Sequence, residues 1–179
     1  METKEAVKRR RSVRSYRPKK VPTDVIETLV EASCKAPSAG DVHPYRIVVV
    51  RKGPKRKGLA KASRGQGFVA RAPVSLVFFV DLGLARRRYG ERGAKLYSLL
   101  DVGAAVENLM ISAVDMGLGT CWVGAFDERA VGELLDAPPQ WRAVSIITLG
   151  WPLGKDKHTP PPLLTEMLRS EGCRTRWSR

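Results

Sequence analysis

Two kinds of hydrophobic pattern alternate along the chain. Short continuous apolar runs, such as Tyr45–Val50, are typical of buried strands, whereas apolar residues at every third or fourth position indicate helices with one buried face. The longest helical pattern runs from Leu99 to Ala113, and we expect Gly117 to cap it. The pattern predicts helices over residues 2–10, from 22 to the loop at 37–41, and over 55–62, 99–113 and 127–135, with strands over 45–50, 73–80, 120–123 and 143–150.

Helix starts and the order of the elements add to this picture. Asp24 followed by Glu27 has the spacing of a capping box, and Asp127 is placed to cap the helix after it. Helices and strands do not follow one another in regular strand–helix–strand repeats, which favours an α+β fold or a mixed α/β sandwich. The 179 residues fit a single domain spanning 1–179.

The hydropathy of the chain bears on its location. No apolar run approaches the roughly 18 residues needed to span a bilayer. The first residues are polar and lack the apolar centre of a signal peptide. We therefore expect a cytoplasmic protein with no membrane partner.

The chain is strongly basic, with a formal net charge of +14 and clusters at Lys8–Arg11, Arg51–Lys57 and Arg86–Arg88. One interpretation is an anionic partner, such as nucleic acid, a phosphate-bearing cofactor or an acidic substrate. The other is a solvated surface. No aromatic residue lies inside these clusters, so they give little support to a surface that binds single-stranded nucleic acid.

Two familiar site patterns are absent or incomplete. The three cysteines show no CxxC pair and no zinc-binding spacing, so we expect no metal site. Cys34 and Cys121 lie among apolar residues, and we expect both to be buried. The stretch Gly65–Ala70 matches GxGxxA, but no strand precedes it and Pro73 is expected to prevent a helix behind it. We therefore predict no dinucleotide fingerprint there.

The segment Arg10–Arg14 places three arginines and a serine within five positions, just past the first helix. If the backbone is extended, Arg10, Ser12 and Arg14 point to one face. That face could hold a phosphate at one end and an electron-rich ring at the other, because arginine binds phosphate bidentately and stays charged. A basic helix end favoured by the helix dipole is the alternative.

Two further stretches suggest close approach of a ligand. The loop Pro37–Tyr45 contains two prolines that fix its course and small residues that leave its backbone accessible. The stretch Gly117–Phe126 places small residues on both sides of a strand, where the N–H groups of Gly124 and Ala125 could reach a flat ring. The alternatives are an ordinary helix-to-strand connection with Tyr45 as a core aromatic, and close packing of strand on helix.

Taken in order, these stretches resemble the motifs of the nitroreductase family. That family has an Arg-Arg-Ser-x-Arg-like segment, a loop with proline and serine, and a helix motif that matches Asp101–Leu109 here. A Gly-Leu-Gly strand, a turn ending in Phe126–Asp127 and the turn Leu149–Pro152 complete the set. Each motif alone is weak, but the ordered set covers nearly the whole chain.

The resemblance implies a fold and an activity. The fold would be a three-layer α/β/α sandwich with a mixed, mainly antiparallel sheet, forming a homodimer that shares its sites between subunits. FMN would be the cofactor and NAD(P)H the co-substrate, with ping-pong transfer of hydride through the flavin. The acceptor would be a nitroaromatic, a quinone or a similar small molecule, which fold resemblance does not identify. No side chain need act as acid or base, so no catalytic residue is assigned.

The resemblance also implies cofactor ligands. Arg10 and Ser12 would contact the phosphate and ribityl chain, and Arg14 the pyrimidine edge, where its charge stabilises the anionic reduced ring. Residues 37–39 would come from the partner subunit, and residues 124–125 would lie over the ring. The expected cofactor-binding set is Arg10, Arg11, Ser12, Arg14, Pro37, Ser38, Ala39, Asp41, Val123, Gly124, Ala125 and Lys157.

The sequence departs from the family pattern in its loop and its tail. The family's Asn, Gln and Trp in the loop are Asp41, His43 and Tyr45 here. For the second phosphate clamp, near the C-terminus, the candidates lie within 155–158, and Lys157 is the one included above. Residues 155–179 are expected to form an extension that packs on the partner subunit.

Two further expectations concern charge. Arg86–Arg88 would attract the phosphates of the nicotinamide donor, with a solvated charge run as the alternative. We expect no nucleic-acid partner, but the net charge of +14 keeps one rival function open. That rival is a basic anion- or nucleic-acid-binding module that keeps the fold without redox activity.

Overall fold

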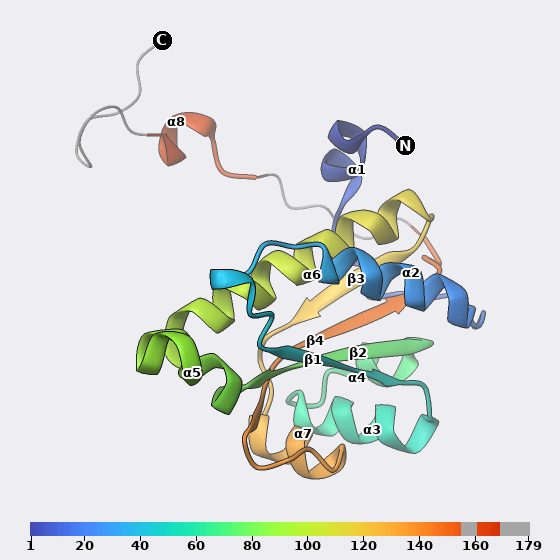
Figure 1. Cartoon of the computed structure of the whole chain (residues 1–179). Coiled ribbons are helices and arrows are strands. Elements are labelled where there is room, and N and C mark those ends of the chain that lie inside the picture. Colours follow the sequence, from blue (N-terminus) through green and yellow to red (C-terminus); the bar gives the residue numbers. More distant parts are fainter. Residues whose placement is uncertain (155–160, 169–179) are drawn as a thin grey trace.

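A computed structural model describes residues 1–154 and 161–168, and Figure 1 shows a central sheet with helices on both faces. The strands are β1 (Tyr45–Val50), β2 (Val74–Asp81), β3 (Gly119–Val123) and β4 (Trp141–Gly150). The helices are α1 (Thr3–Arg9), α2 (Thr23–Cys34), α3 (Gly53–Ala62), α4 (Gly67–Arg71), α5 (Leu82–Arg92), α6 (Ser98–Asp115), α7 (Glu128–Leu134) and α8 (Leu164–Met167), with short helical turns η1 (Ala39–Asp41) and η2 (Gly93–Tyr97).

The strands lie in the order β1-β2-β4-β3, and every neighbouring pair is antiparallel. Within the described residues, the single parallel pairing is an isolated bridge between Ser12 and Thr120. The interior strand β2 is buried from Val74 to Val80, which explains its continuous apolar run. The predicted α+β three-layer sandwich is confirmed.

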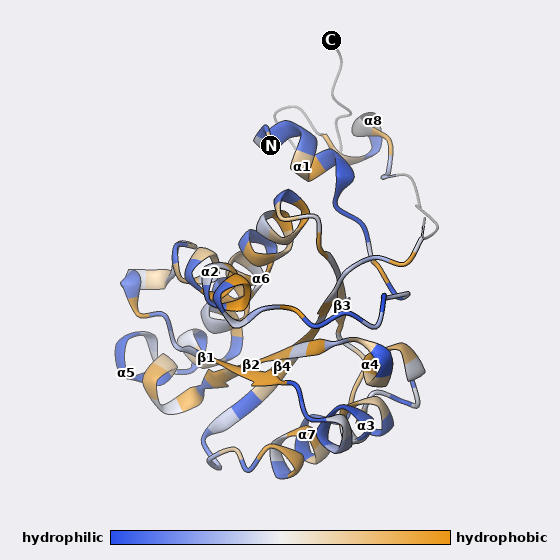
Figure 2. Ribbon diagram, turned by 90° about the vertical axis from the view of Figure 1, so that its right-hand side faces the viewer, coloured by the Kyte–Doolittle hydropathy of each residue, from blue (hydrophilic) through white to orange (hydrophobic). Residues whose placement is uncertain are grey.

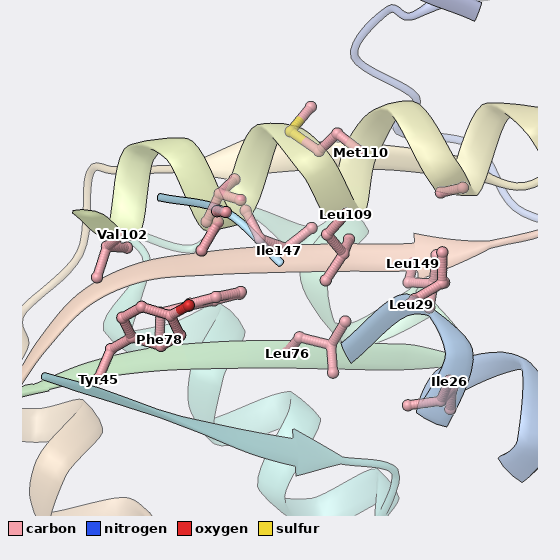
Figure 3. Close-up of a cluster of buried hydrophobic side chains, with 14 of the residues drawn as sticks. Ile26, Leu29, Tyr45, Leu76, Phe78, Val102, Leu109, Met110, Ile147 and Leu149 are labelled. Atoms are coloured by element: carbon pink, nitrogen blue, oxygen red, sulfur yellow. The ribbon is translucent and has the colours of Figure 1, made fainter. Parts of the chain in front are cut away.

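The sheet separates two hydrophobic cores because successive side chains of a strand point to opposite faces. Leu76 and Phe78 of β2 lie in the core beneath α2 and α6, which Figure 3 shows in close-up. Val77 and Phe79 lie in the core shared with α3, α4 and α7. Full burial of a phenylalanine contributes roughly 1.5–3 kcal/mol, so the alternation in this one strand stabilises both layers. Figure 2 shows the apolar residues concentrated in the strands and on the helix faces turned toward them.

Both helix-end predictions based on a single residue hold. Gly117 adopts φ +73°, while its N–H donates to Val114 O at 3.0 Å and that of Leu118 donates to Ala113 O at 2.8 Å. This is the Schellman pattern, which closes α6. Asp127 caps α7 by accepting the N–H of Ala130 at 3.0 Å.

Two predictions of local structure were wrong. The capping box does not form: α2 begins after Pro22 without a side-chain cap, and Asp24 already lies in its first turn. A carboxylate there acts on the helix dipole instead. Pro73 does not prevent a helix behind the glycine-rich stretch, because the short α4 ends at Arg71, before the residue that the proline restrains.

One prediction of environment was also wrong. Cys121 is buried but Cys34 is exposed, because the buried face of α2 passes through Ile26, Leu29 and Ser33 and leaves Cys34 at its margin. The helical run Leu82–Asp115 is long and apolar enough to cross a membrane by length and mean hydropathy alone, although charged residues such as Asp101 and Glu107 interrupt its apolar sequence. Its apolar face packs on the sheet.

Candidate functional site

The segment after α1 lies along the outer edge of β3. The Val13 N–H donates to Thr120 O at 2.8 Å, and Ser12 forms the parallel bridge with Thr120. Val13 is buried, and a Cβ added to Gly119 would lie 2.7–2.8 Å from its side chain. Glycine at 119 therefore permits this close approach. Since Val13 is buried while Arg14 is exposed, the side chains alternate as an extended backbone requires.

The same segment is anchored again as it crosses the end of the sheet. The Tyr16 hydroxyl donates to Val13 O at 2.5 Å and lies 2.7 Å from Thr148 Oγ1. The Leu153 N–H donates to Ser15 O at 3.0 Å. The cationic segment is thus held by backbone and side-chain hydrogen bonds on both sides, which preorganises it for a ligand.

The arginines of this segment differ in their partners. Arg10 Nε lies 3.4 Å from Glu107 Oε1 on α6, and the Arg14 guanidinium carbon lies 5.7 Å from the centre of the Phe68 ring. Arg11 Nε is buried without a hydrogen-bond partner among the described residues, and so is Oγ1 of Thr120, the residue that pairs with Ser12 and Val13. Leaving a buried donor unpaired costs about 1–3 kcal/mol, so an external acceptor at this place would be stabilising.

The end of β3 provides exposed backbone. Val123 is buried, whereas Gly124 and Ala125 are exposed. The Gln66 side-chain amide donates to Ser63 O at 3.1 Å and to Ala125 O at 3.4 Å. Gln66 was missed because its glycine-rich stretch was weighed only as a dinucleotide fingerprint; a polar residue between two glycines was the available signal.

The residues on either side of the start of α4 connect these parts. Phe68 carries Arg14 on its ring, and Gln66 reaches Ala125. The structure therefore brings the segment Arg10–Arg14, the end of β3 and the start of α4 together within one chain. Three arginines, exposed N–H groups and a side-chain amide make this region suited to a ligand with a phosphate and a polar ring.

The loop between α2 and β1 is organised by a buried carboxylate. Asp101 of α6 accepts the Ser38 hydroxyl at 3.0 Å and the Ala39 N–H at 2.9 Å. The Ser38 hydroxyl oxygen in turn accepts the His43 N–H at 2.9 Å. Asp101 was not among the predicted site residues, although it lies in the helix motif that carries the resemblance.

The backbone of this loop is bent sharply. Gly40, Asp41 and His43 all have positive φ, at 59°, 57° and 45°. His43 Nε2 lies 2.9 Å from Asp41 Oδ1, and the Asp41 side chain is 94% exposed. Tyr89 of α5 covers the loop so closely that a Cβ on Gly40 would lie 2.5 Å from its hydroxyl. The loop thus holds an acid–imidazole pair at its surface.

Tyr45, at the start of β1, is a core residue, as the alternative interpretation of the loop proposed. Its hydroxyl donates to Ser33 O at 3.2 Å, and its ring lies against Phe78. Burial raises the pKa of Tyr45 to about 12, and the nearby Cys34 and Asp101 add to the rise. The phenol is therefore neutral at ordinary pH and acts in packing.

The two candidate regions are separate within one chain. Arg10 lies beside Glu107, whereas Ser38 and Ala39 lie at Asp101, six positions earlier in α6 and on another side of the helix. Figure 1 shows η1 beside the start of α6, away from α1 and the segment after it. Lys157 lies outside the described residues.

Apart from a narrow hollow of about 10 Å³ at the loop, lined by Ala39, Tyr89 and Asp101, three cavities lie elsewhere. One of about 760 Å³ follows the edge strand β1, one of about 620 Å³ lies between α3 and α7, and one of about 500 Å³ lies near Pro18–Val21. No group of three or more metal-ligating His, Cys, Asp or Glu side chains occurs within the described part of the chain.

Arg86–Arg88 lie on α5, next to the loop between α2 and β1. Arg86 Nε is 2.7 Å from Glu91 Oε1, and Arg88 Nε would lie 2.7 Å from a Cβ on Gly40. Part of the charge of this cluster is therefore offset within the chain, and its attraction for a nicotinamide donor stays a prediction.

The chain is similar to proteins of known description. A Thermus thermophilus protein described as "NADH dehydrogenase" is 29% identical, over 85% of this chain and 87% of that protein. A Bacillus subtilis protein described as "FMN reductase (NADPH)" is 27% identical, over 84% of this chain and 66% of that protein. The crystal structure of a nitroreductase family protein from Streptococcus pneumoniae superposes with a TM-score of 0.87 at 26% identity, over 95% of this chain and all of that one. The nitroreductase family model matches residues 7–73 and 63–151, and the chain therefore belongs to the nitroreductase family.

Proposed function

We propose that this protein is an FMN-dependent NAD(P)H oxidoreductase that works by a ping-pong mechanism on a nitroaromatic, quinone or similar small acceptor. Membership of the nitroreductase family supports the oxidoreductase class. The names of two relatives, an NADH dehydrogenase and an FMN reductase that uses NADPH, support the cofactor and the kind of donor. FMN, when bound, supplies the reversible hydride chemistry.

One observation carries the proposal most directly: the buried Arg11 Nε lacks an acceptor within the described chain, in a segment with two further arginines. A phosphate monoester fits this donor set, because it offers several charged oxygens to guanidinium groups. In this proposal Arg10 and Ser12, which share one face of the segment, contact the phosphate end of the cofactor, and Arg11 reaches the phosphate from the other side of the backbone. Because the segment is already anchored on β3, little ordering free energy is lost on binding.

The remaining roles follow from position. Arg14 supplies positive charge at the pyrimidine edge, while the N–H groups of Gly124 and Ala125 donate toward the ring. Gln66, whose amide reaches Ala125 O, orients the polar edge. No residue is assigned as acid or base; these groups bind, orient and exclude water.

The absorbance spectrum of the purified protein tests this function. A flavin band near roughly 450 nm, bleached by NADH or NADPH and restored by an acceptor, is expected. A colourless protein that binds duplex DNA with a steep dependence on salt would instead support the basic nucleic-acid-binding module.

We also propose a homodimer in which the loop Pro37–Asp41 of each subunit completes the partner's site. The support is uncovered apolar surface on η2 and the start of α6: Leu100 is 61% exposed and Leu96 39%, and half-buried Gly103 continues this stripe at helical spacing up to Glu107. Contiguous apolar surface of this kind marks a protein interface. A two-fold arrangement through α6 is the common way to bury such a stripe.

Sedimentation equilibrium tests the dimer. Leu100→Lys should shift the protein toward monomer and weaken flavin binding, because each site would lose the partner's loop. Leu153→Lys, at an equally exposed leucine outside the stripe, is the matched control. A flavin-loaded monomer that turns over NAD(P)H would exclude the shared site.

A further inference from the structure

The cavity of about 500 Å³ near the end of β1 has an unusual lining. It lies between the segment before α2, the residue after β1 and the junction of α4 with β2. Its uncharged lining residues are apolar, and among the residues that the structure describes no Asp or Glu lines it. Its cationic side chains are Lys19, Lys20, Arg51, Arg56 and Arg71.

The two larger cavities lack this one-sided charge. The cavity along β1 is lined by the acids Glu27, Glu31 and Asp136 as well as by cations. The cavity between α3 and α7 is lined by Asp127 as well as by cations. The net charge of +14 gives an excess of lysine and arginine over the whole surface, but it does not by itself explain a cavity whose described lining contains no acid. The lining therefore distinguishes this cavity from the general basic surface.

The cations of the cavity are also uncompensated. In the part of the chain that the structure describes, the ion pairs involve none of these five side chains. Like charges gathered around one concavity repel each other, and low-dielectric walls strengthen the positive potential inside it. An anion in the cavity would relieve this repulsion.

Three of the cations are held in place before any ligand binds. Arg56 donates from Nε to Arg51 O at 3.2 Å and from Nη1 to Ala70 O at 2.9 Å, with a further bond to Ala72 O. Arg51 Nη2 donates to Thr23 Oγ1 at 3.2 Å.

Lys19 Nζ lies 4.3 Å from the centre of the Trp151 ring, whose Nε1 donates to Lys20 O at 3.2 Å. Side chains fixed in this way lose less conformational entropy when they bind.

We propose that this cavity binds the phosphate groups of a small phosphate ester or pyrophosphate. Its volume falls within the roughly 300–1,000 Å³ typical of small-ligand sites, and arginine forks match phosphate oxygens. The charge is gathered in a concavity rather than along a stripe, and the described residues that line it include no aromatic ring on which a base could stack, which favours a compact anion over a nucleic-acid strand.

The cavity adjoins the candidate cofactor region but is distinct from it. Arg71 follows Phe68 by three positions on α4, and Phe68 carries Arg14 on its ring. The phosphate source is either the nicotinamide donor, whose adenosine half carries phosphates, or a free phosphorylated metabolite. Both sources share the chemistry that the cavity recognises.

Calorimetric titration of the flavin-loaded full chain with pyrophosphate tests the proposal. The double variant Arg51→Gln/Arg71→Gln should weaken binding by about tenfold or more, since each lost charged contact contributes that order. The matched control Arg9→Gln/Arg129→Gln removes the same charge at exposed arginines outside the cavity and should change binding less than about twofold. Unchanged binding in the cavity variant, or an equal loss in the control, would overturn the proposal.

Further measurements separate the sources and the rival. If the nicotinamide donor supplies the phosphate, the KM for NADPH should rise in the cavity variant while the flavin absorbance of that variant stays unchanged. If a free phosphorylated metabolite supplies it, the KM for NADPH should stay unchanged although the variant binds pyrophosphate more weakly. Binding of duplex DNA with no binding of pyrophosphate would overturn the proposal. A colourless wild-type protein whose pyrophosphate binding still depends on Arg51 and Arg71 would refute the flavin function and leave this site standing.

Discussion

The segment Arg10–Arg14 and the loop Pro37–Tyr45 both carry candidate ligands, but their polar groups are arranged in opposite ways. The segment leaves Arg11 Nε buried without an acceptor within the described chain. The loop satisfies its own groups: Asp101 accepts two of its donors, and His43 pairs with Asp41. An unpaired donor indicates a surface that can bind a ligand. Polar groups that are already paired within the chain instead keep the loop in a fixed shape, which can then contact another subunit.

The largest effect should come from breaking the loop's anchor. Asp101→Ala leaves the Ser38 hydroxyl and the Ala39 N–H without their acceptor, which should cost about 2–4 kcal/mol of unfolding free energy. Urea unfolding measures it, with the exposed Glu27→Ala as control. A loss no greater than in the control would mean that the loop is held by packing alone.

Removing a cation from the segment should affect binding rather than folding. Arg10→Ala should lower FMN affinity by about ten- to a hundredfold, the equivalent of roughly 1.5–3 kcal/mol for a charged phosphate contact. Ultrafiltration of the flavin-loaded protein measures retention. Arg9→Ala, whose arginine pairs with Glu5 at 2.6 Å, is the matched control. Retention of FMN at wild-type affinity would exclude Arg10 as the phosphate ligand.

Displacing the segment tests its attachment to β3. Gly119→Ala places a Cβ 2.7–2.8 Å from the stiff, buried Val13 and should cost about 1–3 kcal/mol as well as weaken FMN binding. Val13→Ala in the same chain should restore much of the binding by making room. Gly53→Ala is the control, because its Cβ would meet nothing within 4 Å and it lies outside the proposed site. Equal melting temperatures for the two single variants would contradict the close approach.

A finer effect concerns the charge beside the ring. Arg14→Ala should lower the flavin midpoint potential by about 20–30 mV, which is roughly 1 kcal/mol for a two-electron couple. FMN affinity should fall less than with Arg10→Ala. Spectroelectrochemical titration measures the potential, with Arg17→Ala as control. An unchanged potential would remove Arg14 from the pyrimidine edge.

The smallest effect is a pH dependence at the base of the loop. Because the folded pKa of Tyr45 is raised to about 12, its stabilising contribution is complete below the unfolded value near 10 and is lost as the pH rises toward 12. Tyr45→Phe cannot ionise, so it should lose less stability than the wild type over that range. Chemical denaturation at pH 9 to 12, with Tyr89→Phe as control, measures the difference; parallel curves would contradict it.

Much of the fold could be predicted because its signals are local. The strand Tyr45–Val50 was predicted with its observed bounds, since the β-branched run Ile47–Val50 follows closely after Pro44. Gly117 and Asp127 marked helix ends through their own conformational preferences. Cys34 shows the limit of such reasoning. The spacing of apolar residues locates the buried face of a helix, but it does not tell how far the neighbouring elements extend over the margin of that face.

The candidate site was only partly predictable. The arginine segment could be found because alternation in an extended chain determines which side chains share a face. Gln66 could not be linked to Ala125 and Asp101 could not be linked to Ser38, because these partners lie 59 and 63 positions apart. Nothing in the intervening residues encodes such a pairing locally.

By itself, the sequence determined the four strands, most of the helices and the basic segment after α1, because hydrophobic period, capping residues and charge act over a few neighbouring positions. The helices α4 and α5 were not predicted, and the three-layer arrangement followed only from the resemblance. Only the tertiary structure decided which polar groups meet. Packing of α6 on the sheet places Asp101 beside the loop. The course of the chain on either side of β2 brings cations from separate segments into one cavity. Contacts of this kind depend on the simultaneous burial of distant residues, which no local pattern contains.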